Sequence, residues 1–494
     1  METHYIACSF EQRDLIEPII ERLSASRAIQ FEAYYNSDDQ IVRAVLTRDF
    51  GFVCPTSEIS LQQLEDQWEQ RYGPIEDSIF AENVQFGVTP VVFFMPLWFA
   101  QKYSVFEEPF GWNSLARLSR DRQVRIQHAS MQQRDGIAVA VAQHIALQSH
   151  DQKGPAEDIK WLQQAVEEYG PDDIEVINRA VAEGDWAADV VIAQERSILA
   201  STQRAPLNNG VIVYPNDGFL VIPNTVAFIK FWERPLGEEA FHSLATDLTA
   251  LGPLDLARSG LHKDVQSLAS SSALHEFQSV TQLKADQRLR WAPHSGGPPV
   301  LLPGRRSVSG IRSLASSAKR GVDVCLLFDS SGSMDNRDKF PNAQLAVDEF
   351  VRLLQGNDSR ACLIRFDSRA VILTSLRRPS HPFYAQSSLE PRGQTALLDA
   401  VELGVSTLES LGNPAHIWAI VAFTDGQENA SNITLAATER HLRGIPKIRF
   451  YGIAYGADAD LEQLSVLATA SGGIATRGDP ATIRAVYGRL STYV

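Results

Sequence analysis

Five oxygen-bearing residues, carried by three separate segments, have the types and spacing of a metal site. They are Asp329, Ser331 and Ser333 in FDSSGSM, Thr395 in GQTALLDA, and Asp425 in AFTDGQEN. Carboxylates and hydroxyls without cysteine or histidine are hard ligands, which suit Mg2+ or Mn2+ better than zinc. We therefore predict a divalent-cation site formed by these side chains.

Two apolar runs indicate how the carboxylates are positioned. The run VDVCLLF at 322–328 stands directly before Asp329, and IWAIVAF at 417–423 stands just before Asp425. Such runs are typical of parallel strands buried on both faces. Because ligands in open α/β sheets collect outside the carboxyl ends of strands, both carboxylates are expected at one edge.

Strands and helices alternate from residue 321 to the end of the chain, as in a doubly wound, Rossmann-like parallel sheet. The patterns predict strands at 322–328, 361–366, 369–375, 417–423 and 447–453, and helices at 341–355, 395–411, 433–443, 460–471 and 480–491. Thr395 then stands at the start of a helix. A lone Asp-x-Ser-x-Ser would be equally typical of a turn. The distant Thr and second Asp favour the metal site.

This segment, 321–494, resembles the von Willebrand factor type A (VWA) domain, whose metal-ion-dependent adhesion site combines Asp-x-Ser-x-Ser with a distant Thr and a distant Asp. The resemblance implies that Asp329, Ser331 and Ser333 hold the cation from one loop. It further implies that Thr395 and Asp425 complete the shell directly or through water. An Asp or Glu of a protein partner would take the open position.

The order of segments in residues 1–283 resembles a type II periplasmic solute-binding protein, on phrases such as IACSFEQRDLIEPII and PVVFFMP. The resemblance implies an α/β module of two lobes that closes on a small, unidentified solute. Lobe 1 is expected at about 1–85 and 230–283, and lobe 2 at about 90–225. The segment GVIVYPNDGFLVIPNTVAFIK, near the expected return crossing between the lobes, is interpreted as an antiparallel pair of strands.

Candidate solute-binding residues lie where expected strands end. They are Ser9, Phe10, Thr56, Ser57, Ser130, Gln132, Glu195 and Tyr214. Each has a plain structural alternative: the hydroxyls cap helices, Glu195 is a surface charge, and Tyr214 belongs to the core with its hydroxyl at the rim.

Residues 284–320 are rich in Pro, Gly, Ser and basic side chains, and they are expected to form a linker between the domains. A basic linker could also bind acidic lipid or RNA, but a solvated connector is favoured. The net charge of −15 over 494 residues argues against a nucleic-acid-binding surface for the chain as a whole.

The longest apolar passage, VTPVVFFMPLWFA at 88–100, is too short to span a membrane and is interpreted as a buried strand and turn. No secretory leader is recognised, so the chain is expected to be cytoplasmic unless a leader has been removed. The cysteines Cys8, Cys54, Cys325 and Cys362 are widely spaced and are expected to be buried thiols.

No catalytic motif is recognised: the phosphate loop, the nucleophile elbow and the zinc helix are all missing from the sequence. Together the two resemblances suggest a bacterial fusion of a solute-binding module with an adhesion-type domain. We expect a noncatalytic binding protein that recruits a protein through its cation, with recruitment regulated by the solute. The alternatives are an extracytoplasmic transport-type receptor and a metal-dependent hydrolase.

Overall fold

The computed structural model divides the chain into two compact units, Met1–Ala165 with Gly170–Ala315, and Val166–Tyr169 with Ser316–Val494. The residues described are 3–26, 29–47, 50–131, 133–148, 156–181, 186–204, 209–230, 237–268, 289–292, 297–335, 339–354, 358–379, 390–456, 459–478 and 490–491. Over these residues, no helix has the length and apolar character needed to cross a membrane.

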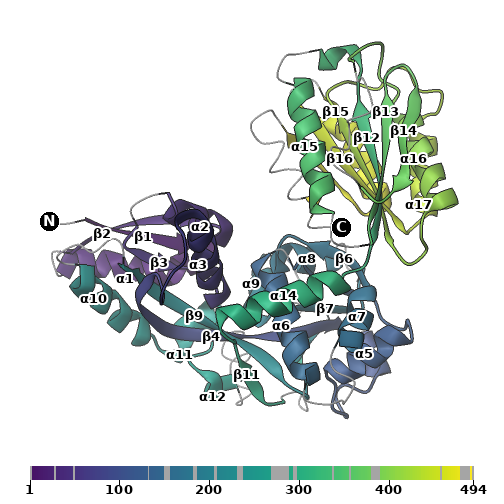
Figure 1. Cartoon of the computed structure of the whole chain (residues 1–494). Coiled ribbons are helices and arrows are strands. Elements are labelled where there is room, and N and C mark those ends of the chain that lie inside the picture. The colour runs from purple at the N-terminus through teal and green to yellow at the C-terminus, as the bar shows by residue number, and fades with distance from the viewer. Residues whose placement is uncertain are drawn as a thin grey trace. The chain divides into compact units, whose positions relative to one another are not determined.

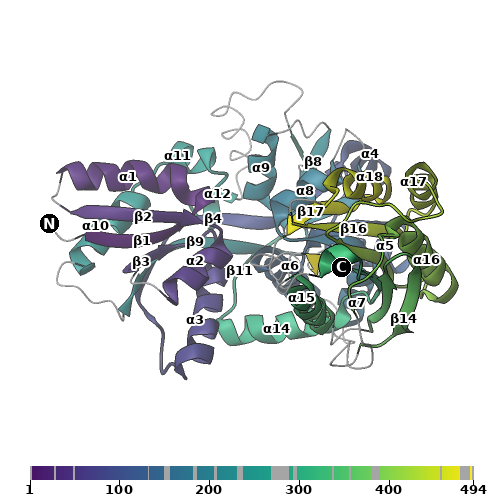
Figure 2. The ribbon, with the colours of Figure 1, turned by 90° about the horizontal axis from the view of Figure 1, so that it is seen from above.

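The first lobe of the first unit is a sheet covered by helices on both faces. Its strands β2 (Gln30–Asn36), β1 (Thr3–Ser9) and β3 (Phe52–Cys54) are parallel neighbours. Its helices are α1 (Arg13–Ser26) and α10 (Gly237–Thr249) on one face, with α2 (Asp38–Val45) and α3 (Glu58–Tyr72) on the other. Figure 2 shows α1 and α3 on opposite sides of the strands. Along β1, Ile6 and Cys8 pack toward α1 whereas Ala7 packs toward α2, which explains the unbroken apolar run.

Two long antiparallel strands, β4 (Phe80–Pro96) and β9 (Phe219–Ile229), connect the lobes. β4 pairs with β9 from Phe80 to Pro90, and its second half pairs with strands of the other lobe. Figure 1 shows both strands running between the two groups of helices. This connection by two crossing strands is the two-lobed α/β arrangement that the sequence predicts.

The second lobe surrounds the far half of β4. Its strands are β5 (Ile126–Ala129), β7 (Val190–Gln194) and β8 (Gly210–Val213). β6 (Val166–Gly170) continues the same sheet next to β5, although its residues Val166–Tyr169 are grouped with the second unit. The helices of this lobe are α4 (Leu97–Lys102), α5 (Trp112–Arg120), α6 (Arg134–Gln148), α7 (Ala156–Gln164), α8 (Asp173–Ala180) and α9 (Glu195–Arg204). The expected pairing of β8 with β9 is wrong: each pairs antiparallel with β4, because β4 is long enough to serve as partner to both.

The stretch 284–320 differs from the connector that its composition predicts. β10 (Arg290–Trp291) pairs with β8, β11 (Pro299–Leu301) pairs with β9, and α14 (Arg305–Ala318) follows. The Arg305 guanidinium lies 2.8 Å from the Glu69 carboxylate on α3. Acidic side chains of the module thus hold the basic residue in place, so this stretch is largely part of the first unit.

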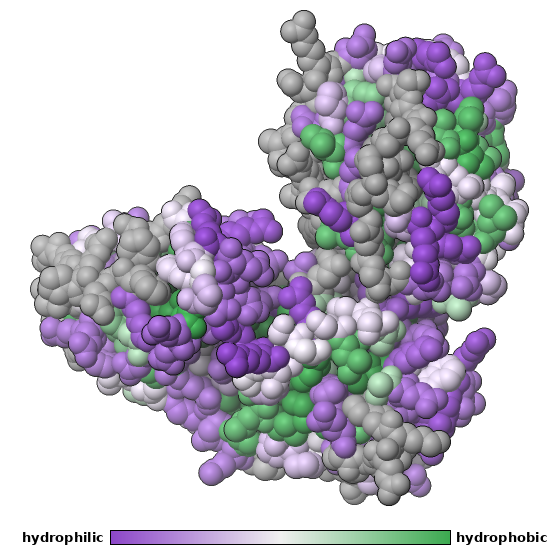
Figure 3. All heavy atoms as spheres, in the orientation of Figure 1, coloured by the Kyte–Doolittle hydropathy of each residue, from purple (hydrophilic) through white to green (hydrophobic). Residues whose placement is uncertain are grey.

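Among its described residues, the first unit also contains the helices α11 (Pro253–Arg258) and α12 (Val265–Leu268). Figure 3 shows a mainly hydrophilic surface, with a patch of hydrophobic residues beside α14. Exposed charged groups are expected on a chain with a net charge of −15.

The second unit is a six-stranded sheet in the order β14-β13-β12-β15-β16-β17. The strands are β12 (Val322–Asp329), β13 (Arg360–Phe366), β14 (Ala370–Arg377), β15 (Ile417–Thr424), β16 (Ile448–Tyr455) and β17 (Ile474–Gly478). The helices are α15 (Lys339–Leu353) on one face, with α16 (Leu397–Leu411), α17 (Leu435–Gly444) and α18 (Leu461–Ser471) on the other. All strand pairs are parallel except β13–β14, which confirms the doubly wound architecture with an antiparallel edge strand. The expected closing helix at 480–491 lies outside the described residues except at 490–491.

The cysteines form two cross-strand pairs in the two units. Cys8 is the register partner of Cys54, and Cys325 is the partner of Cys362, with Sγ atoms 3.3 Å apart in the second pair. All four are buried free thiols, and their predicted burial is confirmed.

Candidate functional sites

The carboxyl ends of β12 and β15 place the two predicted carboxylates at one edge of the second sheet. These strands are parallel neighbours with Phe328 opposite Phe423, so Asp329 and Asp425 leave the sheet side by side. Both are buried, at 0% and 1% exposure. Unpaired ionised carboxylates at such depth are costly, so each is expected to have hydrogen-bond donors or a cation beside it.

Hydroxyl groups bridge the two strand ends. The Ser331 Oγ and Ser333 Oγ atoms are 2.9 Å apart, and Ser333 Oγ donates to Asp425 Oδ1 at 2.5 Å. Both carboxylate oxygens of Asp329 accept hydrogen bonds: Ser331 N donates to Oδ1 at 2.8 Å, and Thr424 Oγ1 donates to Oδ2 at 2.5 Å. The loop after β12 therefore contacts the end of β15 through side-chain oxygens.

Thr395, which comes just before α16, completes the group. A Cβ atom added to Gly426 would lie 2.7 Å from Thr395 Oγ1 and 3.5 Å from Ser333 Oγ. Thr395 N donates to Asn429 Oδ1 at 2.9 Å, which ties its loop to the segment after β15. The structure thus brings together all five predicted metal-site residues, with Ser333 exposed to solvent.

Positive charge near this site stabilises the ionised forms of its two buried carboxylates. Burial raises the pKa of Asp329 to about 6, although hydrogen bonds from Thr424 and Ser331 oppose the shift. The ammonium group of Lys339, at the start of α15, lies 2.6 Å from Asp425 Oδ2. Sequence reasoning missed Lys339 and Thr424; the position of Thr424, directly before Asp425, was the available signal.

The donor set fits a hard divalent cation. Among the described residues, no group of three or more His, Cys, Asp or Glu side chains is arranged to hold a metal, so hydroxyls would have to supply part of any shell here. Asp329, Asp425, Ser331, Ser333 and Thr395 offer such a mixture of carboxylate and hydroxyl oxygens, and those of Ser331, Ser333 and Asp425 are in direct contact. Mg2+ and Mn2+ are the cations that prefer it.

The lobe 1 residues predicted to bind solute lie mainly in capping roles. Ser9 Oγ accepts a hydrogen bond from Glu11 N, and Ser57 Oγ accepts one from Ile59 N at 3.1 Å. Phe10 is 57% exposed. Thr56 is buried, and its Oγ1 donates to Asp38 Oδ2 at 3.0 Å. Of these residues, Thr56 has a side chain in contact with the other lobe.

The lobe 2 candidates divide into a buried pair and residues of the loop before α6. Glu195 Oε1 accepts a hydrogen bond from the Tyr214 hydroxyl at 2.8 Å, and His262 Nε2 lies 2.6 Å from Glu195 Oε2. This trio is buried. Ser130 is 1% exposed, and its Oγ has no hydrogen-bond partner among the described residues. Gln132 lies outside the described residues.

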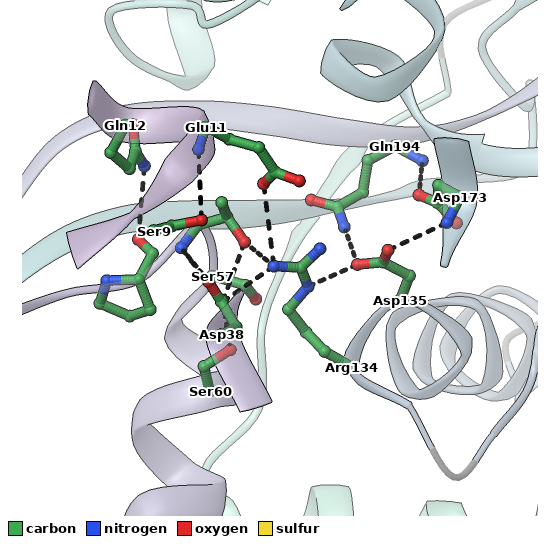
Figure 4. Close-up of polar contacts among 12 residues, drawn as sticks. Ser9, Glu11, Gln12, Asp38, Ser57, Ser60, Arg134, Asp135, Asp173 and Gln194 are labelled. Carbon is green, nitrogen blue, oxygen red and sulfur yellow. Dashed lines mark hydrogen bonds and ion pairs between the residues drawn. The ribbon is translucent and has the colours of Figure 1, made fainter. Parts of the chain in front are cut away.

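A charged network that sequence reasoning missed joins the two lobes (Figure 4). Arg134, the first residue of α6 in lobe 2, extends its guanidinium to Asp38 Oδ2 in lobe 1 at 2.8 Å. The same guanidinium donates to Thr56 Oγ1 and lies 2.5 Å from Asp135 Oδ1. Glu11 is at 4.0 Å. The only sequence signal was the adjacent pair of opposite charges, Arg134 and Asp135, which is common on helix surfaces.

Beyond Arg134 the network continues through lobe 2. Asp135 accepts from Gln194 Nε2 at 2.8 Å and from Asp173 N at 3.1 Å, and Gln194 N donates to Asp173 Oδ2 at 2.7 Å. These contacts connect the N-termini of α6 and α8 with the carboxyl end of β7. Buried polar side chains therefore meet where strands and helices of both lobes end.

Comparison with known proteins matches residues 324–427 to the family model of the von Willebrand factor type A domain. A curated relative, calcium-activated chloride channel regulator 3A-1 of Mus musculus, is 28% identical over 167 residues, which are 33% of this chain and 18% of that protein. The chain thus spans less than a fifth of that relative.

Comparison with solved structures gives similarities that each cover part of the chain. A von Willebrand factor type A protein from Catenulispora acidiphila is 21% identical, with 35% of this chain and 42% of that chain covered and a TM-score of 0.31. The sulfate-binding protein SubI from Mycobacterium tuberculosis is 15% identical, with 60% and 96% covered and a TM-score of 0.39. An ABC transporter structure from Clostridium perfringens is 10% identical, with 63% and 96% covered and a TM-score of 0.41.

Proposed function

Since residues 324–427 carry a von Willebrand factor type A domain, we propose that the protein is a noncatalytic binding protein that recruits a protein partner through a divalent cation. The ion would be Mg2+ or Mn2+. Asp329, Ser331, Ser333, Thr395 and Asp425 would hold it, and a carboxylate of the partner would contact it. The observation that carries this proposal is the contact of Ser331, Ser333 and Asp425 oxygens at one sheet edge, where Ser333 is exposed to solvent.

The use of nearby acids supports a binding role over hydrolysis. Glu428, the closest acid in sequence after Asp425, accepts hydrogen bonds from the backbone N–H groups of Leu398, Ala430 and Ser431 at 3.0, 2.9 and 2.7 Å. A carboxylate engaged in this way holds its loop and is poorly placed to take a proton from water. The bound cation would supply an electrophilic position for an acidic side chain of the partner.

For the first unit we infer binding of a small solute between its lobes. The support is the Arg134 network, in which side chains of both lobes meet around buried charges. Closure of two lobes on a solute is a hinge motion that changes the exposed surface of a protein. Such a change would allow the solute to regulate recruitment by the second unit.

The first experiment measures Mg2+ binding to the full chain by calorimetry and by thermal unfolding with and without chelator. Wild type should bind Mg2+ and unfold at a higher temperature in its presence, whereas Asp425→Ala should show neither effect. Asp358→Ala, which removes a side chain that is 66% exposed in the same unit, is the matched control. An Asp425→Ala variant with an unchanged Mg2+ response would refute the metal site.

Partner recruitment is tested on the same proteins. Proteins of the native host that are retained in Mg2+ should be lost with chelator and with Asp329→Ala, but not with Asp358→Ala. Each retained protein is then purified, and its exposed Asp and Glu residues are replaced individually. One such replacement should abolish binding, because the proposal requires a partner carboxylate. Retention that is insensitive to chelator would contradict recruitment through the cation.

A further inference from the structure

The network between the lobes contains more buried acid than base. The residues Asp38, Asp135 and Asp173 are each at most 7% exposed, and the more exposed Glu11 lies beside them. The cations among them are Arg134 and Arg196, whose guanidinium groups contact Asp38 and the Glu11 carbonyl oxygen respectively. Formal negative charge therefore exceeds positive charge, which is unfavourable at low polarity unless another cation or protons join the cluster.

Buried oxygen atoms without hydrogen-bond partners also indicate that a further donor group would fit in this cluster. Gln194 Oε1 and Asp173 Oδ1 are buried oxygens that have no hydrogen-bond partner among the described residues; Gln194 Oε1 can only accept, and Asp173 Oδ1 accepts when its carboxyl is ionised. Their residues are 2% and 1% exposed. Figure 4 shows the Gln194 side-chain oxygen directed toward Glu11 and Arg134, inside the cluster. Each buried acceptor without a donor costs about 1–3 kcal/mol, so an N–H donor is the group that the Gln194 oxygen lacks.

Arg134 shows what kind of group fits. Its guanidinium comes from lobe 2, yet it makes its contacts with Asp38 and Thr56 of lobe 1, so one positive, planar donor group connects the lobes. It does not satisfy the acceptors of Gln194 or Asp173. The Glu11 side chain is 38% exposed, so solvent reaches the cluster at this residue.

We propose that the solute is a small organic cation with N–H donors, an amine or a guanidinium compound, bound by the carboxylates of Asp38 and Asp135 and by the Gln194 side-chain oxygen. This inference deepens the proposed solute binding and rests on it. The ligand competes with the Arg134 guanidinium for the same carboxylates. It also supplies the donors that the buried acceptors lack.

An anionic solute is the opposing possibility, since Arg134 and the nearby helix N-termini could attract one. Two observations disfavour it. The Arg134 guanidinium is already engaged by Asp38 and Asp135, so an anion would have to displace carboxylates that cannot leave the chain. An anion would also bring further acceptors to Gln194 Oε1, which already lacks a donor.

The test is calorimetric titration of the full chain with putrescine and agmatine, and separately with sulfate and phosphate. Wild type should bind at least one of the two amines and none of the anions. Asp135→Asn should weaken amine binding at least tenfold, and Gln194→Leu should weaken it without changing the charge. Arg134→Met should tighten it about tenfold, because the internal competitor is lost. Asp77→Asn, at a side chain that is 89% exposed, is the control for the loss of an acid.

The outcomes separate this inference from the function on which it rests. Amine binding that weakens in Asp135→Asn and tightens in Arg134→Met supports it. Binding of an anion that Arg134→Met abolishes overturns the cationic class but leaves solute binding intact. Wild type that binds neither amines nor anions overturns the inference, and with it the support that this network gives to solute binding. Because Arg134→Met is expected to gain affinity, a misfolded variant cannot imitate the supporting result.

Discussion

The Nζ atom of Lys339 lies 2.6 Å from Oδ2 of Asp425, at the place where the metal-site hydroxyls also gather. The Asp425 side chain is fully buried and the Lys339 side chain is 23% exposed, so this ion pair is largely shielded from solvent. An ammonium group of the chain itself thus balances the carboxylate. A divalent cation that takes Asp425 as a ligand has to compete with this lysine.

Lys339→Met should therefore tighten Mg2+ binding. A hydrogen bond between charged groups contributes about 1.5–3 kcal/mol, so we expect an affinity gain of about tenfold or more by calorimetry. The control Arg443→Met removes an exposed cation that pairs with Glu439 on α17. Weaker Mg2+ binding in Lys339→Met would mean that the lysine supports the site and does not compete for it.

Gly426→Ala should weaken Mg2+ binding without unfolding the domain. The added Cβ would lie 2.7 Å from Thr395 Oγ1, so the hydroxyl has to move away from the other ligands. Displacements around metal ligands typically reduce affinity by about tenfold to a hundredfold. Gly444→Ala is the matched control, since no atom lies within 4 Å of its added Cβ. Equal Mg2+ affinities of the two variants would exclude Thr395 from the site.

Asp329→Asn should stabilise the metal-free protein above pH 6 while abolishing its response to Mg2+. Burial raises the pKa of Asp329 to about 6, so ionisation of this carboxyl lowers the free energy of unfolding as pH rises toward that value. The shift corresponds to about 3 kcal/mol at neutral pH, and the amide removes this cost. Thermal unfolding in chelator at pH 5 and pH 8 measures it, and the gain should be larger at pH 8.

Asp323→Asn provides a control of opposite sign in the same sheet. Although burial opposes the shift, hydrogen bonds from His416 and Arg360 hold the pKa of Asp323 below its usual range. Its ionised form therefore stabilises the fold above the pKa of an unfolded aspartate, and this stability is lost as pH falls through the lowered folded pKa. The amide should destabilise the protein at pH 8. If Asp329→Asn also destabilised the protein at pH 8, this would contradict the argument that the ionised Asp329 carboxylate destabilises the metal-free fold.

The edge of the second sheet was predictable because its signals are local. An apolar run fixes where β12 ends, and the residues after it reach the edge without further information. Asp329 and Asp425 are thus placed by the two strands that precede them. Lys339 was not predictable, because its contact with Asp425 depends on how α15 packs and not on a pattern in its own segment.

The network in the first unit could not be derived from short motifs. Asp38, Arg134, Asp173 and Gln194 belong to four segments that meet only because β4 and β9 join the lobes. The sequence directed attention to hydroxyls at strand ends, and Ser9 and Ser57 proved to cap helices. Likewise the composition of 284–320 indicated a solvated linker, because it carries no sign that Arg305 pairs with acids on α3.

Binding of an organic cation between the lobes should release protons. Burial, together with the neighbouring Asp135 carboxylate, holds the pKa of Asp173 well above its usual range. Asp172 also raises this pKa, whereas the Gln194 N–H and the Arg134 guanidinium lower it. A cation beside Asp173 favours its ionised form, so binding lowers the pKa of this carboxyl, which releases protons in the pH range between its two pKa values. Affinity should therefore rise with pH by up to about tenfold per unit for one proton.

Calorimetry of agmatine binding in two buffers of different ionisation enthalpy measures the released protons directly. The apparent binding enthalpy should differ between the buffers for wild type, and the difference should become smaller in Asp173→Asn, which cannot titrate at this position. The control Asp77→Asn, which removes an exposed carboxyl, should keep the enthalpy difference between the buffers. Equal enthalpies for wild type in both buffers would show that Asp173 does not change its protonation when the cation binds. The affinity of wild type would then stay constant with pH, and the excess acid of the cluster would have to be balanced within the protein.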